Sequence, residues 1–176
     1  MAGDGPPTTA LGTLLATLPQ RGRVQWIGVR PARRVPAIGV DAAEARPGLG
    51  LTGDRFAGTV ASKRQVTLIQ AEHLAAVAAL LGRPALDPGL VRRNVVIAGI
   101  NLYALRHARF RVGSVLLGGT GICAPCARIP EALGPGGFNA MRGHGGITAR
   151  VLEAGVIRVG DEVVLVEAGT LGPEEH

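Results

Sequence analysis

The clearest β-forming segment of the chain is Val156-Ile157-Arg158-Val159-Gly160-Asp161-Glu162-Val163-Val164-Leu165-Val166. Two short runs rich in β-branched residues flank a Gly-Asp pair, and such a pair between apolar runs is typical of a tight turn. We therefore predict two strands here, joined as a β-hairpin.

The composition extends this β-rich character to the whole chain. Of 176 residues, 47% are hydrophobic, 27 are glycine and 12 are proline, while aromatic residues make up only 3%. Abundant turn-forming residues favour short strands and tight connections over long helices, and a chain of this length is about the size of one domain. We expect a mainly β domain with a few short helices.

Other segments predict the remaining elements. Thr9 is a candidate cap for a helix that carries leucines at helical spacing, and a clearer helix runs from Ile69 to Leu81 and ends at Gly82. Pro47 to Arg55 is expected to form an ordered surface loop, because glycine interrupts any regular element there. Further strands are predicted at residues 24–29, 64–68, 94–98 and 109–118, and a short helix near residues 147–154.

Charge and hydropathy narrow the class of protein. The net charge is +6, and 18 of the 19 basic residues are arginine, with Lys63 the only lysine. Scattered arginines and few aromatic rings do not suggest nucleic-acid binding. No apolar run approaches the ~20 residues that span a bilayer, and no signal peptide is recognisable. We expect a cytoplasmic protein without a membrane segment.

The motif best suited to catalysis or metal binding is Cys123-Ala124-Pro125-Cys126-Ala127-Arg128. One Cys-x-x-Cys supplies half of a zinc site, and no second cysteine pair exists to complete it, so no separate zinc site is expected. A thiol–disulfide pair remains open, although Pro130 disfavours the helix that usually activates such a pair. A single reactive thiolate that ligates a soft metal or carries a persulfide is a further possibility, and Arg128 would favour that thiolate.

Two further segments are candidate binding elements. Gly143-His144-Gly145-Gly146 precedes the predicted helix at 147–154, so its backbone N–H groups could face an anion, with His144 as a pocket donor. Asp54-Arg55 and Arg92-Arg93-Asn94 place charged and amide groups beside predicted strands. Their participation depends on convergence with the cysteine motif, which spacing alone does not show.

Several segments, taken in order, resemble MOSC domains, which are named for the C-terminal domain of molybdenum cofactor sulfurase. The resemblance covers about residues 22–168, with residues 1–21 as an N-terminal extension containing a short helix and 169–176 as a flexible tail. The segments are Gly50-Leu51-Thr52-Gly53-Asp54-Arg55, Arg64-Gln65-Val66-Thr67-Leu68-Ile69, Arg92-Arg93-Asn94-Val95-Val96-Ile97-Ala98-Gly99-Ile100, Gly113-Ser114-Val115-Leu116-Leu117, the cysteine motif and Gly155-Val156-Ile157-Arg158-Val159-Gly160-Asp161.

The resemblance implies a closed β-barrel of the MOSC type, similar to the pyruvate kinase β-barrel, that binds the molybdenum cofactor. It implies that Cys126, rather than Cys123, is the metal ligand or persulfide carrier. It also implies that Arg92 and Asn94 contact the pterin phosphate or its surroundings, and that Arg33 serves the same anion. With Arg55, Arg128, His144 and Gly145, these residues form the predicted cofactor site.

The chain resembles stand-alone bacterial members, without a fused sulfurase or electron-transfer domain. A sulfur donor or an electron-transfer protein is therefore the expected partner, and a small molecule the expected substrate. Reduction of N-hydroxylated compounds and sulfur transfer are both compatible with the resemblance. The alternative is a non-catalytic anion-binding barrel in which the two cysteines are structural.

Overall fold

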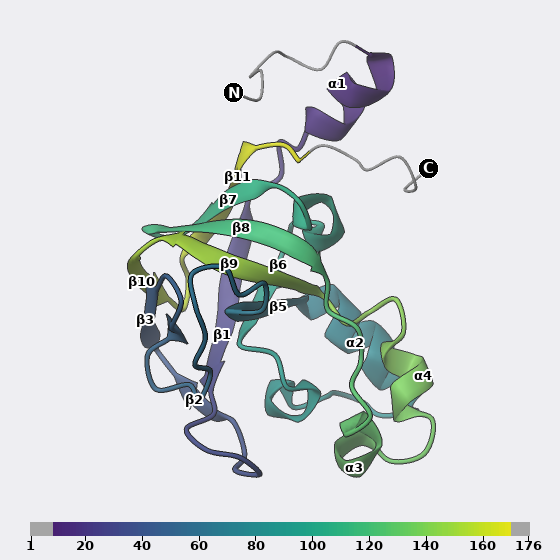
Figure 1. Cartoon of the computed structure of the whole chain (residues 1–176). Coiled ribbons are helices and arrows are strands. Elements are labelled where there is room, and N and C mark those ends of the chain that lie inside the picture. Colours follow the sequence, from purple (N-terminus) through teal and green to yellow (C-terminus); the bar gives the residue numbers. More distant parts are fainter. Residues whose placement is uncertain (1–8, 170–176) are drawn as a thin grey trace.

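The computed structural model describes residues 9–169, and Figure 1 shows a β-barrel with the later helices gathered along one side and the N-terminal helix apart from them. The strands are β1 (Gly22–Val29), β2 (Ile38–Val40), β3 (Ala42–Arg46), β4 (Gly50–Leu51), β5 (Val66–Gln70), β6 (Val95–Ala98), β7 (Arg109–Val112), β8 (Val115–Ile122), β9 (Ile147–Glu153), β10 (Gly155–Arg158) and β11 (Glu162–Glu167). The helices are α1 (Ala10–Ala16), α2 (Ala71–Leu80), α3 (Ile129–Leu133) and α4 (Gly137–Met141), with 3-10 turns at Pro88–Val91 and Leu102–Leu105.

Seven strands close the barrel in the order β11-β7-β8-β9-β5-β6-β1, and the pairing of β1 with β11 completes the circle. The strand β2 extends this sheet beyond β1, while β10, β3 and β4 form a separate three-stranded sheet. All barrel pairs are antiparallel except β5 with β6, which are parallel. The predicted mainly β fold, a closed barrel with a few short helices, is confirmed.

Aliphatic side chains fill the barrel. Ile27, Leu68, Ile97 and Leu117 are fully buried there, and Phe110 is the largest side chain among them. A second apolar cluster lies between the helices and the outer faces of β5 and β6, so every residue of β5 is buried. The helices α2, α3 and α4 therefore cover one wall of the barrel. This wall packs against the barrel core on its inner face and against the helices on its outer face.

The prediction of a hairpin at residues 156–166 is correct for both strands but wrong for their pairing. β10 pairs with β3, whereas β11 pairs with β7 and β1. The turn between them bonds elsewhere: the Gly160 N–H donates to the Val24 carbonyl (2.8 Å), the Val24 N–H donates to the Asp161 carbonyl (2.9 Å) and the Val159 N–H donates to the Asp41 carbonyl (2.9 Å). These bonds direct the two strands into different sheets.

Two other predictions of local structure are wrong. Residues 147–153 form β9 rather than a helix, because alternate residues Ile147, Ala149 and Val151 enter the core and the strand pairs with both β5 and β8. Residues 109–118 form two strands rather than one, since Gly113 adopts φ +57° and turns the chain back on itself.

The remaining predicted elements agree with the structure within small shifts. The strand predicted at 64–68 is β5. Because β5 runs to Gln70, the helix expected from Ile69 begins at Ala71 instead. Gly82 follows the end of this helix, α2, with φ +64°. The Thr9 side chain accepts a hydrogen bond from Gly12 N–H at the start of α1. The glycine-rich segment Pro47 to Arg55 is less exposed than the predicted surface loop, since Gly50 and Leu51 form β4 and are buried. Within residues 9–169 no helix is long and apolar enough to cross a membrane.

Candidate functional site

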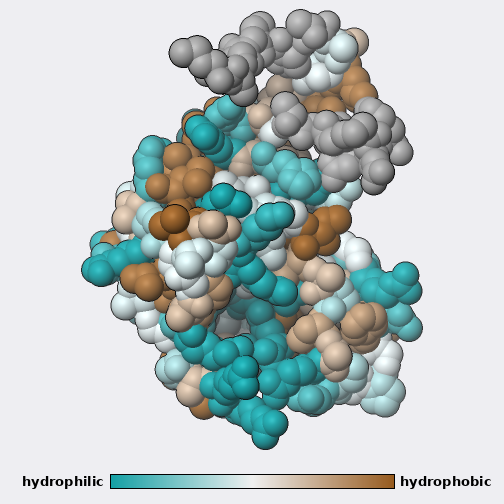
Figure 2. All heavy atoms as spheres, in the orientation of Figure 1, coloured by the Kyte–Doolittle hydropathy of each residue, from teal (hydrophilic) through white to brown (hydrophobic). Residues whose placement is uncertain are grey.

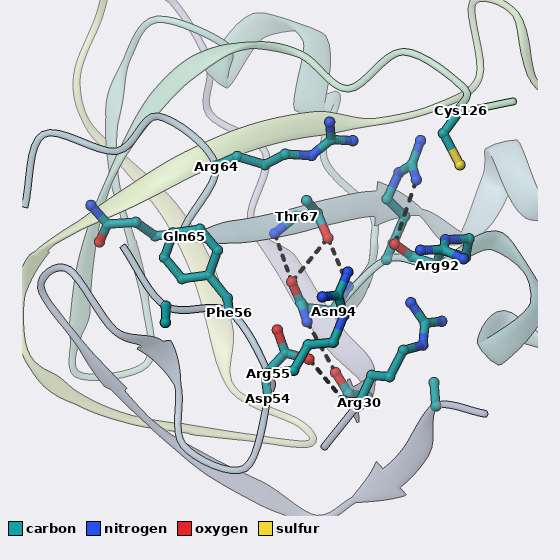
Figure 3. Close-up of a pocket in the computed structure, with 14 residues that line it drawn as sticks. Arg30, Asp54, Arg55, Phe56, Arg64, Gln65, Thr67, Arg92, Asn94 and Cys126 are labelled. Carbon is teal, nitrogen blue, oxygen red and sulfur yellow. Dashed lines mark hydrogen bonds between the residues drawn. The ribbon is translucent and has the colours of Figure 1, made fainter. Parts of the chain in front are cut away.

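A cavity of about 470 Å³ lies beside the barrel wall formed by β1, β5 and β6 (Figure 3). Arginine side chains dominate its lining, and they come from distant parts of the sequence: Arg30 follows β1, Arg55 belongs to the glycine-rich loop, Arg64 precedes β5, and Arg92 precedes β6. Cys126 borders the same cavity. Figure 2 shows hydrophilic residues gathered over the lower part of this face, near the β1–β2 loop.

Arg30 joins two of the loops that form the cavity. Its backbone N–H donates to the Asp54 carboxylate (2.8 Å), its carbonyl accepts from the Arg55 N–H (2.7 Å), and its Nε donates to the Val35 carbonyl (3.0 Å). Burial lowers the pKa of Arg30, and the positive charges of Arg92, Arg55 and Arg128 lower it further, against the opposing effect of Asp54. Arg30, Arg55 and Arg92 line the same cavity, so several guanidinium groups lie close together.

Arg55 and Arg92 have no hydrogen-bond or ion-pair partner for their side chains within residues 9–169. Figure 3 shows them extending into the cavity from opposite loops. A guanidinium group is a strong bidentate donor to phosphate and carboxylate. Two such groups without partners within residues 9–169 therefore make the cavity suited to bind an anion.

Asn94 lines the cavity, but its amide is already engaged. Its Oδ1 accepts hydrogen bonds from the backbone N–H and the hydroxyl of Thr67, each 3.0 Å, and its Nδ2 donates to the Gly28 carbonyl (3.2 Å) (Figure 3). The side chain thereby ties the start of β6 to β5 and β1. Its contribution to the cavity in this structure is to position the wall that carries Arg92.

The two cysteines have different surroundings. Cys126 is half-buried at the cavity, whereas Cys123 is only 1% exposed and its Sγ lies 3.0 Å from Nη2 of Arg64. Only one of the two thiols therefore faces the space in which a ligand would sit.

Arg93 holds the cysteine loop in place. This side chain is 3% exposed; its Nε donates to the Gly145 carbonyl (2.7 Å), its Nη1 to the Val91 carbonyl (3.0 Å), and its Nη2 to the carbonyls of Cys123 (3.1 Å) and Ala124 (3.3 Å). Burial lowers the pKa of Arg93, while its proximity to Cys123 and Cys126 raises it. A buried guanidinium group therefore holds the backbone of the loop that carries both cysteines.

The predicted site residues thus fall into two groups. Cys126, Arg55, Arg92 and Asn94 come together at the cavity. Arg33 lies in an exposed turn away from it, and Arg128, which pairs with Glu131 (3.3 Å), lines an adjoining cavity instead.

The glycine segment at 143–146 does not line this cavity. The Nδ1 of His144 lies 3.0 Å from the Ala140 carbonyl, and its ring contacts His73 edge to face, with centroids 5.2 Å apart. Gly145 is buried, and an added Cβ there would lie 2.1 Å from the Cys123 carbonyl. Because β9 follows, no helix N-terminus exists to form the predicted anion cradle.

Three arginines that line the cavity were not predicted as site residues: Arg30, Arg64 and Arg93. Arg93 lies within the segment Arg92-Arg93-Asn94, which the sequence already indicated as a candidate binding element. Arg30 and Arg64 carry no local signal, since each is one of many scattered arginines, and only the closure of the barrel brings them together.

The family model for the MOSC domain matches residues 52–164 of this chain. A comparison with curated proteins gives no match. Among solved structures, YuaD from Bacillus subtilis is similar with a TM-score of 0.72 and 19% identity, over 84% of this chain and 97% of that one.

YiiM from Geobacillus stearothermophilus is similar with a TM-score of 0.68 and 21% identity, over 83% of this chain and 75% of that one. YiiM from Escherichia coli is similar with a TM-score of 0.62 and 19% identity, over 82% and 69%. At these identities the structural likeness supports the fold alone. Because the family model spans well over half of the sequence, the chain belongs to the MOSC domain family, which is associated with the molybdenum cofactor.

Proposed function

We propose that this chain binds the molybdenum cofactor in the arginine-lined cavity, with Cys126 as the sulfur ligand of the metal. The observation that supports the proposal most strongly is that a half-buried thiol and two unpartnered guanidinium groups, those of Arg55 and Arg92, border the same cavity. A soft thiolate suits molybdenum, and guanidinium groups suit the cofactor's phosphate.

The size and the charge of the cavity also fit the cofactor. A volume of about 470 Å³ lies within the range of ~300–1,000 Å³ that is usual for sites of small ligands. Arg30, Arg55, Arg64 and Arg92 bring positive charge, whereas Asp54 is the one acidic residue among the lining residues and already accepts the Arg30 backbone N–H. An anionic ligand would therefore meet an excess of donors.

In this proposal each part of the chain has a separate task. Arg55 and Arg92 bind the phosphate, while Arg93 fixes the backbone of the cysteine loop. Asn94 keeps the wall under Arg92 in register with β5. When bound, molybdenum would supply oxygen-atom removal from N-hydroxylated compounds, with electrons delivered by a partner protein.

Sulfur transfer is the second candidate. Its support is that Cys126 is the thiol at the cavity and that the Arg93 side chain fixes the same loop through the carbonyls of Cys123 and Ala124. The Cys126 thiolate would attack the outer sulfur of a cysteine persulfide on a donor protein and release the donor's thiolate. A nucleophilic acceptor in the cavity would then take this outer sulfur and release Cys126 as a thiolate. In this case the thiol changes between two covalent states, whereas in the first candidate it stays a metal ligand.

The test is to express the full chain in a host that makes the cofactor and to measure molybdenum, pterin and cyanide-releasable sulfur per chain. The proposal expects molybdenum and pterin in wild type, loss of most molybdenum in Cys126→Ser, and retention in the matched control Cys123→Ser. Cyanide-releasable sulfur without molybdenum would favour the sulfur carrier. Wild type with no molybdenum, pterin or labile sulfur would instead favour an anion-binding barrel with structural cysteines.

A further inference from the structure

A second cavity, of about 710 Å³, adjoins the first and shares Arg30, Ala37 and Arg92 with it. We propose that this second cavity binds the anionic group of the substrate, so that the substrate is a small molecule bearing a phosphate or a carboxylate. The inference rests on the proposed function, because it takes the chemistry to occur at Cys126 in the first cavity.

Positive charge exceeds negative charge in the second cavity. Arg30, Arg34, Arg92 and Arg128 line it, together with the carboxylates of Asp87 and Glu131. Both carboxylates have partners, since Asp87 accepts the Gly89 N–H (2.8 Å) and Glu131 pairs with Arg128 (3.3 Å).

The side chains of Arg34 and Arg92 have no hydrogen-bond or ion-pair partner within residues 9–169. Because a guanidinium group has five N–H donors, Arg92 can contact the cofactor's phosphate in the first cavity and, together with Arg34, one phosphate or carboxylate group in the second.

The backbone gives an independent argument for the same two residues. Arg34 and Arg92, each with φ 60°, are the only non-glycine residues with positive φ in the part of the chain that the structure describes. A side chain disfavours this conformation, which glycine adopts freely, and strained residues of this kind cluster at binding and active sites. Both strained positions carry arginine and line the same cavity, as expected if the side chains serve a ligand.

The rest of the lining indicates the body of that ligand. Val35, Pro36, Leu90 and Ala132 give the cavity an apolar part. A compact apolar or flat body with one anionic group matches this mixture of surfaces. Because Arg92 also lines the first cavity, a molecule anchored in the second cavity can extend past Arg92 towards Cys126. This continuity assigns the second cavity to the substrate of the same site.

The experiment follows the backbone amides of Val35, Ala37 and Leu90 by NMR in the ¹⁵N-labelled full chain, with and without cofactor. The probes are phenyl phosphate, benzoate and benzyl alcohol, which share a ring but differ in charge. We expect at least one anion to shift these amides in a saturable way, and benzyl alcohol to leave them unmoved at the same concentrations. The ratio of the two anions' affinities then decides between phosphate and carboxylate.

Arg34→Gly and Arg33→Gly form the matched pair of variants, because both residues lie in the same exposed turn and Arg33 lines neither cavity. Arg34→Gly is expected to weaken binding of the anionic probe about tenfold, the effect of one charged hydrogen bond. Its thermal midpoint should stay the same or rise, because glycine relieves the positive φ. Arg33→Gly is expected to change affinity less than twofold.

Equal losses in the two variants, an unchanged affinity in Arg34→Gly, or equally tight binding of benzyl alcohol would overturn the inference. Its failure is distinguishable from failure of the proposed function, since probe binding is measured in protein without cofactor as well. Molybdenum loading with no probe binding refutes only the anionic substrate. Probe binding without molybdenum loading refutes the cofactor proposal, and leaves an anion site that is not a substrate site.

Discussion

Arginines on the outside of the barrel and arginines at the cavity have different surroundings. On the outside of the barrel, Arg21 pairs with Glu162 (2.9 Å) and Arg111 with Glu153 (2.7 Å), and the four side chains are between 39% and 67% exposed. At the cavity, Arg55 and Arg92 have no such partner within residues 9–169. The difference shows that a residue's type is a poor guide to its role here, because the same guanidinium group is neutralised on the wall and available at the cavity.

Arg93 belongs to neither group, because its side chain is buried and bonded to backbone carbonyls, and its substitution is expected to have the largest effect on stability. Its replacement in Arg93→Leu would leave buried carbonyls of Gly145, Val91 and Cys123 without donors. We expect a loss of about 3 kcal/mol in the free energy of unfolding, since each buried unsatisfied group costs ~1–3 kcal/mol. Urea denaturation measures this loss. A change below ~1 kcal/mol would show that the cysteine loop does not depend on Arg93.

The second prediction concerns the cavity directly. Arg92→Ala should weaken binding of the cofactor by ~10- to 100-fold, because it removes a hydrogen bond to a charged group worth ~1.5–3 kcal/mol. The measurement is the release of pterin from loaded protein over a dilution series. The matched control is Arg111→Ala, which removes a wall arginine and should change retention less than twofold. Equal effects in both variants would remove the distinction between the two groups of arginines.

The third prediction concerns the wall arginine itself. Arg111→Ala should lower the free energy of unfolding by no more than ~1 kcal/mol, since ion pairs between exposed side chains contribute little. Raising the salt concentration should reduce even this difference. A loss of several kcal/mol in thermal or urea denaturation would mean that the wall pairs carry part of the barrel's stability.

The smallest expected effect is a pH dependence on the helical side of the molecule. Burial, with the nearby His144, lowers the pKa of His73 against the opposing effect of Glu72. The unfolded chain, with a histidine pKa near ~6.5, therefore takes up this proton first, and stability should fall as pH decreases from about 7 to below 6. His73→Phe should flatten this part of the stability–pH curve. An unchanged slope in the variant would assign the dependence to another group.

Local sequence patterns predicted the strands better than their pairing. β-branched runs identified β1, β6, β10 and β11, but nothing near Gly160 indicated that the turn would bond to Val24 and Asp41. The segment that forms β9 was ambiguous for a different reason. Ile147 and Val151 satisfy a helical spacing of four residues as well as strand alternation, and only its two neighbouring strands select the extended form.

The cavity could be predicted only in part. Family resemblance selected Cys126, Arg92 and Asn94, and charge beside a predicted strand selected Arg55; these four residues meet at the cavity. The resemblance also selected Arg33, which does not line it. Arg30 and Arg64 were missed, because their approach depends on barrel closure between segments far apart in the chain.

The most direct test of the account is X-ray absorption at the molybdenum edge on cofactor-loaded wild type and on the molybdenum that Cys126→Ser retains. If Cys126 is the protein ligand, the wild-type spectrum should require one sulfur neighbour more than that of Cys126→Ser, and Cys123→Ser should match wild type. The same number of sulfur neighbours in wild type and Cys126→Ser would contradict the central assignment of Cys126 to the metal.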